Sequence, residues 1–439
     1  MQDKFEKTIF ILLVLFGIST SVSIAATNFL LGLLFLLFIM NWVKTKKVFY
    51  SIEGLPLLFL FCWRGLRGLS SLYHHAYWLK YCGKFWDHIP YFVIPNVKTK
   101  KTRYIIYITL FIASFIALLG IIQFFLKFEY PFLPLQPFRE GHFLGLNFVN
   151  RMHTGGYYGI ITGFCLVFFC FLAEDKKLKY IFLICFLINI SAVLLAQART
   201  YYVAIGLTVF LILLAKSVRW FLLGSCLVII AAFGVFQLNP QFKNRFVSIF
   251  NTKDNMSNLE RLWMWDVSLR IIKKQPLTGV GYKNWKTEVE NYFEREKEKN
   301  PLVWLISRSR RNGVSEQDIL SALKAHPHNA YLNVAVDDGI IGLILFLLFW
   351  IGNLVQAFRR AKKNIHGSLS YALNMAVGFS ITMLLIGGVF ENNLTTARLL
   401  LPMTFFIGLS YGERARLTGL VGQGTDAELN TEKTSVTLH

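Results

Sequence analysis

Charged residues are scarce in this sequence. Only 16% of its 439 residues are Asp, Glu, Lys or Arg, against about 25% in an ordinary soluble domain. Hydrophobic residues make up 54%, and the mean hydropathy is +0.47. This combination excludes a disordered chain and a soluble globular domain. The six cysteines all lie in or beside apolar runs, which excludes the disulfide framework of a small secreted protein.

Acidic residues are scarcer than basic ones, with 25 Asp and Glu against 46 Lys and Arg, so the net charge is +21. Such an excess alone does not distinguish nucleic-acid binding from membrane topology. Most of the basic residues fall in every second short connection between apolar runs, for example 44–47, 98–103 and 359–363. This alternation follows the positive-inside rule and predicts that both termini are cytoplasmic. It points away from nucleic acid.

The apolar runs are long enough to cross a bilayer, which takes about 20 residues per helix. Together they predict an all-α, polytopic membrane protein of about twelve transmembrane helices. We interpret the first run as an uncleaved helix rather than a signal peptide, because it is long and a second run follows at once. The runs are 8–26, 28–43, 54–69, 78–95, 104–126, 155–173, 180–198, 201–215, 220–236, 335–358, 370–390 and 399–411.

These runs divide the chain into four parts. Residues 1–236 hold nine predicted transmembrane helices, and 335–412 hold three more. Between them, 237–334 form a large external loop with helices expected near 258–274 and 284–299 and a short third one running toward His326. We expect residues 413–439 to be a disordered cytoplasmic tail, because they are polar and rich in Gly and Thr.

A histidine pair at the end of the large loop is the first candidate for chemistry. His326 and His328 flank a proline at the mouth of the next span, and imidazole suits proton transfer near neutral pH. The same string also fits a polar helix start, with Asn329 or His328 as the N-cap. No further ligand lies at a metal-like spacing in the loop, so we expect neither a metal nor another cofactor.

Isolated arginines at the outer ends of spans are the second candidate. Ionisable residues at such depth are costly, and Arg binds phosphate bidentately, so Arg199, Arg151 and Arg261 are candidate phosphate ligands. The alternative is that such side chains reach the lipid headgroups. We favour headgroup contact for Arg64, Arg67 and Arg398. The loop arginines Arg308, Arg310 and Arg311 fit either contact with an acidic substrate or exposure to solvent.

Three strings in this order resemble the core motifs of the O-antigen ligase superfamily. They are Leu195-Ala-Gln-Ala-Arg199-Thr, Pro276-Leu-Thr-Gly279-Val-Gly281, and His326-Pro-His328-Asn-Ala-Tyr331-Leu followed by Gly339-Ile-Ile-Gly342-Leu. One large external loop before the histidine motif completes the resemblance. The chain departs from the family pattern at Asp337, where relatives commonly carry Glu.

The resemblance implies a glycosyltransferase-C-like enzyme of the bacterial inner membrane, with a helical periplasmic loop domain and an active site facing the periplasm. Such a ligase moves a glycan from undecaprenyl pyrophosphate to lipid A-core oligosaccharide, without a metal or nucleotide, to complete lipopolysaccharide. The matching positions imply His328 as the base, His326 as its support and Arg199 as a catalytic cation. The expected substrate-binding residues are Arg261, Arg151, Arg310, Arg311 and Asp337.

Related functions stay open from the sequence. An O-antigen polymerase uses the same donor but passes the glycan to another repeat unit, and protein O-oligosaccharyltransferases share the histidine motif. A flippase or transporter is less favoured, because the intramembrane charges gather at outer span ends and the chain shows no obvious repeat.

Overall fold

The protein is helical. The computed structural model describes residues 2–70, 83–97, 99–126, 138–139, 142–143, 151–227, 256–281, 284–296, 299–300, 303, 323 and 326–417. Within these ranges the only strands are β1 (Phe138–Arg139) and β2 (His142–Phe143), two residues each and paired antiparallel. The protein is therefore all-α in class, as predicted.

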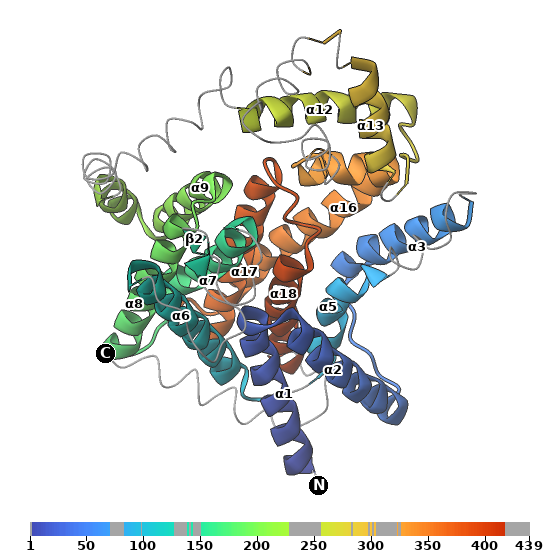
Figure 1. Ribbon diagram of the computed structural model, residues 1–439. Helices are drawn as coiled ribbons and strands as arrows, with labels where there is room; N and C mark the ends of the chain where they lie inside the picture. The colour runs from blue at the N-terminus through green and yellow to red at the C-terminus, as the bar shows by residue number, and fades with distance from the viewer. Residues whose placement is uncertain are drawn as a thin grey trace.

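The helices follow the chain from the blue N-terminal end to the red C-terminal end of Figure 1. The long helices are α1 (Gln2–Val22), α2 (Ile24–Thr45), α3 (Leu55–Ser70), α6 (Thr102–Leu126), α7 (Arg151–Phe171), α8 (Lys176–Leu195), α9 (Arg199–Lys216), α12 (Met256–Lys274), α13 (Trp285–Glu296), α16 (Ala330–Lys363), α17 (Leu369–Gly388) and α18 (Ala397–Leu417). The short ones are η1 (Ile52–Gly54), η2 (Trp86–His88), α5 (Ile89–Val93) and η3 (Ile94–Asn96).

Eight helices in the described part of the chain are long and apolar enough to cross a membrane, namely α1, α2, α6, α7, α8, α9, α16 and α17. The predicted number of about twelve is not confirmed. Helix α3 has 16 residues, and the segment Val218–Leu227 is shorter still. The predicted runs 78–95 and 220–236 lie partly outside the described residues, as does most of the expected tail. The chain is a polytopic membrane protein.

Helix α7 forms the centre of the bundle. Of its apolar stretch, 94% is buried, and its neighbours include α8, α9 and α17. Glycines at its start allow this close packing. A side chain at Gly155 or Gly156 would meet the ring of Tyr201 on α9, and one at Gly159 would meet Ile205. Small residues at helix contacts are typical of membrane bundles, where close backbone approach replaces the hydrophobic drive of water.

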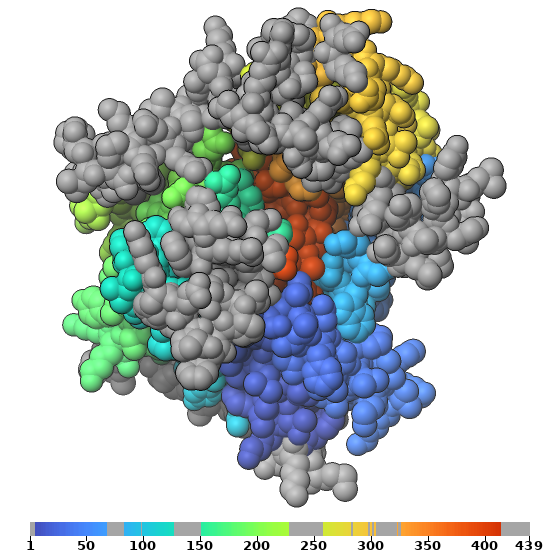
Figure 2. Space-filling view, viewed as in Figure 1, coloured from blue at the N-terminus to red at the C-terminus, as the bar shows by residue number. Residues whose placement is uncertain are grey.

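A second, smaller core lies outside the bundle, where α12 and α13 cover one end of it (Figure 1). Trp263, Val267 and Ile271 share one face of α12 because they are spaced by four residues. They pack with Val289 and Phe293 of α13. We call this unit the cap. In the space-filling view, orange and red segments are visible below the yellow atoms of the cap, between the blue N-terminal helices and the teal and green ones (Figure 2).

The cap is joined to the bundle by direct backbone pairing between residues 276–281, after α12, and residues 336–340 inside α16. We call this pairing the clasp. It accounts for the Pro-Leu-Thr-Gly-Val-Gly string in structural terms. Three hydrogen bonds form it: Val280 N to Val336 O at 2.8 Å, Gly281 N to Asp337 O at 3.0 Å, and Ile340 N to Pro276 O at 2.8 Å.

Two glycines make the clasp possible. Gly279 and Gly339 have φ values of +63° and +73°, which residues other than glycine rarely adopt. A Cβ on either residue would also overlap the backbone of the opposite segment. Gly339 interrupts α16. The first nine residues of the helix therefore run in a different direction from its membrane-spanning part.

Helix α3 reinforces the clasp through an ion pair. The guanidinium of Arg64 holds Asp338 Oδ2 at 2.7 Å through Nη2 and 3.0 Å through Nε, with the side chains 11% and 3% exposed. Arg67 donates to the carbonyl of Gly279 at 2.9 Å. The expectation that Arg64 and Arg67 contact lipid headgroups is therefore wrong, because their partners come from distant parts of the chain.

The end of the bundle opposite the cap carries the basic connections. Glu6 accepts a hydrogen bond from the backbone of Lys100, and Arg103 pairs with Glu174 at 3.3 Å. The last turn of α16 adds Arg360, Lys362 and Lys363 at the same end. The short basic loops and the cap thus lie on opposite sides of the apolar helices (Figure 1).

The Arg64–Asp338 pair yields a stability prediction. We expect Arg64→Ala to lower the free energy of unfolding by about 3–5 kcal/mol, because it leaves a buried carboxylate without its cation. The matched control is Arg103→Ala, whose half-exposed pair with Glu174 should contribute about 0–1 kcal/mol. Thermal unfolding of the purified proteins in one detergent measures both. Equal losses in the two variants would contradict this role of Arg64.

Candidate functional site

The histidine string forms a tight loop before α16. Asn329 caps that helix, with Oδ1 accepting hydrogen bonds from the backbone amides of Tyr331 and Leu332 at 2.9 Å. His328 has a φ of +52°, unusual for a residue with a side chain. The helix-start interpretation is thus correct for Asn329, and the same cap fixes the position of the histidine beside it.

Two further contacts hold this loop. The backbone N–H of His328 donates to Nδ1 of His326 at 3.1 Å. From the cap, Trp265 Nε1 donates to the carbonyl of Pro327 at 3.0 Å. Since Nδ1 of His326 accepts a hydrogen bond, the proton of that ring is assigned to Nε2. The loop is therefore fixed both to α16 and to α12.

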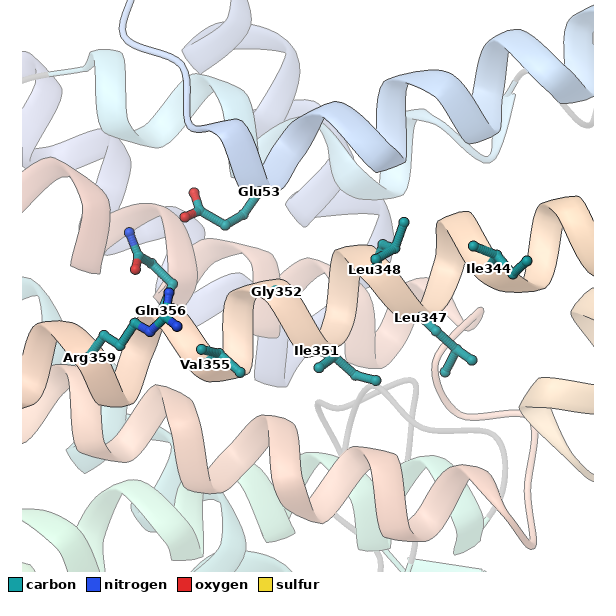
Figure 3. Close-up of a pocket in the computed structure, with 9 residues that line it drawn as sticks. All are labelled: Glu53, Ile344, Leu347, Leu348, Ile351, Gly352, Val355, Gln356 and Arg359. Atoms are coloured by element: carbon teal, nitrogen blue, oxygen red, sulfur yellow. The ribbon is translucent and has the colours of Figure 1, made fainter.

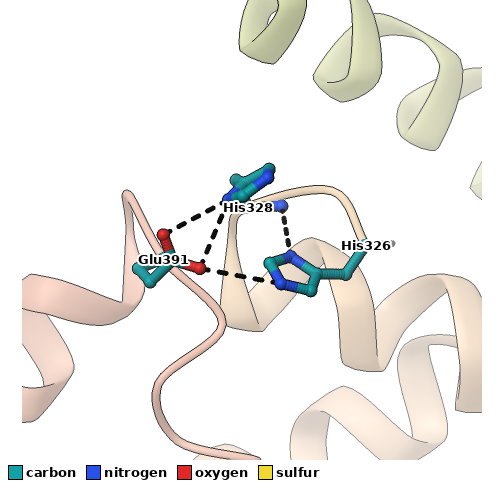
Figure 4. Close-up of side chains that lie close together, drawn as sticks. All are labelled: His326, His328 and Glu391. Atoms are coloured by element: carbon teal, nitrogen blue, oxygen red, sulfur yellow. Dashed lines mark hydrogen bonds and ion pairs between the residues drawn. The ribbon is translucent and has the colours of Figure 1, made fainter. Parts of the chain in front are cut away.

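A carboxylate from the other end of the sequence completes the cluster. Glu391 follows α17 and is 7% exposed. Its oxygens lie 3.2 and 3.3 Å from Nδ1 of His328, and Oε1 lies 3.7 Å from Nε2 of His326 (Figure 4). Arg261 Nη2 of α12 lies 3.8 Å from Oε2. Three separate segments thus meet at one carboxylate.

The electrostatics of the cluster favour an ionised Glu391. Burial raises the pKa of its carboxyl, but the hydrogen bond with His328 and the charges of His328, His326 and Arg261 outweigh burial and lower the pKa to about 2. Burial lowers the pKa of His326 and His328 adds to the decrease, while Glu391 opposes it, so that the pKa is about 4. At neutral pH, Glu391 is an anion and His326 is neutral.

This arrangement can support a general base. When Nδ1–H of His328 donates to the Glu391 carboxylate, Nε2 is left as an acceptor, and the carboxylate stabilises the imidazolium once a proton arrives. The side chain of His328 is 29% exposed, so a substrate can reach it. The arginine beside the carboxylate provides a fixed positive charge for a developing anion.

The same three side chains can also hold a metal. One donor atom each of His326, His328 and Glu391 lies within 4.8 Å of the others. The expectation that the loop lacks a third ligand is thus true only within the loop, because Glu391 comes from a distant segment. Arg261 lies against the same carboxylate, and its positive charge opposes a cation there.

The other predicted cations lie at the same end of the bundle. Arg199 is the first residue of α9, and Arg151 is the first of α7. Two residues into α7, His153 is close enough to Glu391 and Arg398 for electrostatic interaction with both. No described contact joins Arg199 or Arg151 to the carboxylate, so phosphate binding by either stays a prediction.

The remaining predicted residues lie elsewhere. Asp337 is 8% exposed inside the clasp, where its carbonyl accepts from Gly281, and no described contact links it to the histidines. Substrate binding by Asp337 stays a prediction. Arg310 and Arg311 lie outside the described residues.

Sequence reasoning missed Glu391. It stands 63 residues after His328, immediately beyond the apolar run 370–390, so no local motif connects the two. The signal that could have found it was its position. An acidic residue at the end of a membrane span is a functional candidate, because placing a charge there costs free energy. Only folding shows that this residue, rather than Asp337, faces the imidazoles.

Taken together, these features define a polytopic all-α membrane protein with a histidine, carboxylate and arginine cluster at one end of its helices. Residues 184–347 match the family model described as O-antigen ligase. This match supports membership of the O-antigen ligase superfamily. No curated protein matches its sequence.

The matched region contains most of the cluster. It includes Arg199, Arg261 and both histidines, whereas Glu391 lies beyond it. The family covers O-antigen ligases and polymerases, and the match supports a membrane enzyme of that general, glycosyltransferase-like kind. The family in general implies lipid-linked O-antigen and the core of lipopolysaccharide as substrates.

The depressed pKa of His326 predicts a pH-dependent stability. In the unfolded chain this histidine binds a proton near its ordinary pKa of 6.5, whereas in the folded protein it does so only near 4. The unfolded state therefore gains protons first, and stability falls as pH decreases from about 6.5 to about 4. Melting temperatures measured across that range should fall less steeply for His326→Gln. The exposed His366→Gln is the control, and an unchanged slope in His326→Gln would refute the assignment.

Proposed function

We propose that the protein is an O-antigen ligase that transfers a glycan from undecaprenyl pyrophosphate to a sugar hydroxyl of lipid A-core, inverting the anomeric carbon without a metal. The observation that carries this proposal is the contact of His328 with Glu391 beside Arg261, within and next to the family-matched region. This supports a base and a fixed cation at one point, as displacement of a pyrophosphate requires.

In the proposed reaction, Nε2 of His328 takes the proton of the acceptor hydroxyl while its oxygen attacks the anomeric carbon. The bond from that carbon to the pyrophosphate breaks, and undecaprenyl pyrophosphate leaves with the bonding pair. Glu391 holds the imidazole in the accepting tautomer and stabilises its charged form. His326 supports the loop that carries His328.

Arginine residues have the role of stabilising the leaving group. Arg261 is buried among the cluster residues, which lowers its pKa from the ordinary value while Glu391 opposes the decrease. It stays cationic at neutral pH. We assign Arg199 and Arg151 to the same pyrophosphate, since both begin helices at this end of the bundle. Backbone amides at a helix start also favour an anion.

The distribution of charge supports a periplasmic site in the inner membrane. The short basic connections lie at the end opposite the cap and the cluster. By the positive-inside rule that end, with both termini, is cytoplasmic, and the cluster faces the periplasm. There the lipid-linked donor and the lipid A-core acceptor meet.

His328→Ala should lower the rate of glycan transfer by about 10²–10⁴-fold, because the acceptor loses its base. The transfer rate of Glu391→Gln should lie between those of His328→Ala and the wild type, since the amide keeps a hydrogen-bond acceptor but loses the negative charge. The measurement is transfer from lipid-linked glycan to rough lipopolysaccharide by purified protein in detergent, at equal protein level. A His328→Ala enzyme with the wild-type rate would rule out the base assignment.

Arg261→Ala should lower the rate of glycan transfer by about 10²–10³-fold, because the leaving pyrophosphate loses a hydrogen-bond donor as its negative charge develops. Arg270→Ala is the matched control, because Arg270 lies on the same helix but pairs with Asp266 and Glu296 at the surface. Equal rates in the two variants would contradict a role of Arg261 at the leaving group.

The same assay distinguishes the proposed function from its neighbours. Full activity in EDTA supports the metal-independent reaction, and abolition by EDTA with rescue by a divalent cation would overturn it. Extension of the lipid-linked glycan itself, without transfer to rough lipopolysaccharide, would identify a polymerase. Transfer without a sealed compartment excludes transport as the measured activity.

A further inference from the structure

A groove runs along the face of α16 on the far side of the clasp from the histidine cluster. It encloses about 430 Å³ between α16 and η1. Its floor and walls are aliphatic from Ile344 to Val355, and polar side chains gather at one end only (Figure 3). None of the residues lining it belongs to the cluster around Glu391.

The apolar part has the form of a site for a hydrocarbon chain. Ile344, Leu348, Ile351 and Val355 follow one another at spacings of four, three and four residues, so they form a single stripe. Each is 40–53% exposed in the bundle. From Ile344 to Arg359 the helix rises roughly 22 Å, which covers the roughly 15 Å depth of one leaflet of the hydrocarbon core.

The polar end carries both signs of charge. Glu53 of η1 approaches from one side, and Gln356 and Arg359 lie on the last turns of α16 (Figure 3). Arg359 is exposed and makes no ion pair with the described residues. Beside it, Lys362 and Lys363 mark the level of the lipid headgroups, where basic residues flank a membrane span.

The carboxylate at this end is held by a buried network. The hydroxyl of Tyr411 lies 3.0 Å from Glu53 Oε2 and 3.1 Å from Asn353 Oδ1. The guanidinium of Arg360 stacks on the Tyr411 ring, 3.5 Å from its centre. Tyr411 and Asn353 are 2% and 3% exposed. The Glu53 side chain is therefore held in position, and its Oε1 makes no hydrogen bond within the described part of the chain.

We propose that this groove is a binding site for one glycerophospholipid with a phosphoethanolamine headgroup. An acyl chain lies along the aliphatic stripe, the phosphate accepts hydrogen bonds from Arg359 and Gln356, and the primary ammonium donates to Glu53. A headgroup with only negative charge would face the Glu53 carboxylate without compensation, and a quaternary ammonium has no proton to donate. The site is independent of the proposed glycan transfer.

The test is binding of defined lipids to the delipidated, purified full-length protein in detergent. Phosphatidylethanolamine, phosphatidylglycerol and phosphatidylcholine with matched acyl chains are titrated separately, and bound lipid is counted by native mass spectrometry. We expect one phosphatidylethanolamine to bind about tenfold or more tightly than the other two, as one charge-assisted hydrogen bond provides. Equal binding of the three lipids, or preference for phosphatidylglycerol, would overturn the proposal.

Variants separate the parts of the site. Arg359→Gln should weaken phosphatidylethanolamine binding about tenfold, while Lys362→Gln, an exposed neighbour outside the groove, should leave it unchanged. Glu53→Gln should remove the preference over phosphatidylglycerol. If Arg359→Gln and Lys362→Gln bind alike, the headgroup assignment is wrong.

A blocking variant tests the groove without touching the charges. A Cβ at Gly352 would lie 3.8 Å from Glu53 Cγ, which is ordinary van der Waals contact, so Gly352→Leu can fill the groove without backbone overlap. We expect this variant to keep the wild-type melting temperature or exceed it and to lose the bound lipid. Wild-type lipid binding by Gly352→Leu would place the lipid elsewhere and refute the proposal.

Discussion

The clasp between residues 276–281 and 336–340 is the constraint on which the site depends. Its backbone hydrogen bonds join the cap to a membrane-spanning helix at the point where Gly339 interrupts that helix. The interruption sets the direction of the first nine residues of α16, and therefore the position of the histidine loop in front of them. Arg64 fixes the same point from α3 by neutralising Asp338. Without this junction, Arg261 and Trp265 of the cap would have no fixed position relative to His328.

Glu391 has the corresponding role in the electrostatics. A buried carboxylate is costly alone, and here three nitrogen-bearing side chains offset that cost. The same contacts orient the His328 ring and place a cation beside it. A single anion thus links α12, the histidine loop and the end of α17. The contacts of Glu391 therefore account both for the stability of the cluster and for its suitability for acid–base chemistry. The proposed lipid groove has a different arrangement, with charged side chains of both signs at one end and aliphatic residues along its length.

Much of this organisation could be predicted from the sequence, because its signals are local. Apolar runs predict helices wherever they reach the length of a bilayer, and the run 104–126 corresponds to α6, Thr102–Leu126. The histidine motif could be recognised because imidazole suits proton transfer, and Arg261 because a charged residue at the end of a span costs free energy. Prediction was weaker at short or interrupted runs such as 78–95, where the described part forms η2, α5 and η3. For Arg64, headgroup contact was the local expectation, and its partner lies 274 residues away.

The sequence by itself determined that this is a helical membrane protein, which strings carry its family resemblance, and that imidazoles and arginines stand at the ends of its spans. These properties follow from hydropathy and residue type, which act over a few helical turns. The tertiary structure alone decided which charges meet. It brought Glu391 rather than Asp337 to the histidines, gave Arg64 to Asp338, and placed Glu53 across a groove from Arg359. Such pairings depend on distances across the fold, because electrostatic interaction is strongest between groups that folding has both buried and brought into contact.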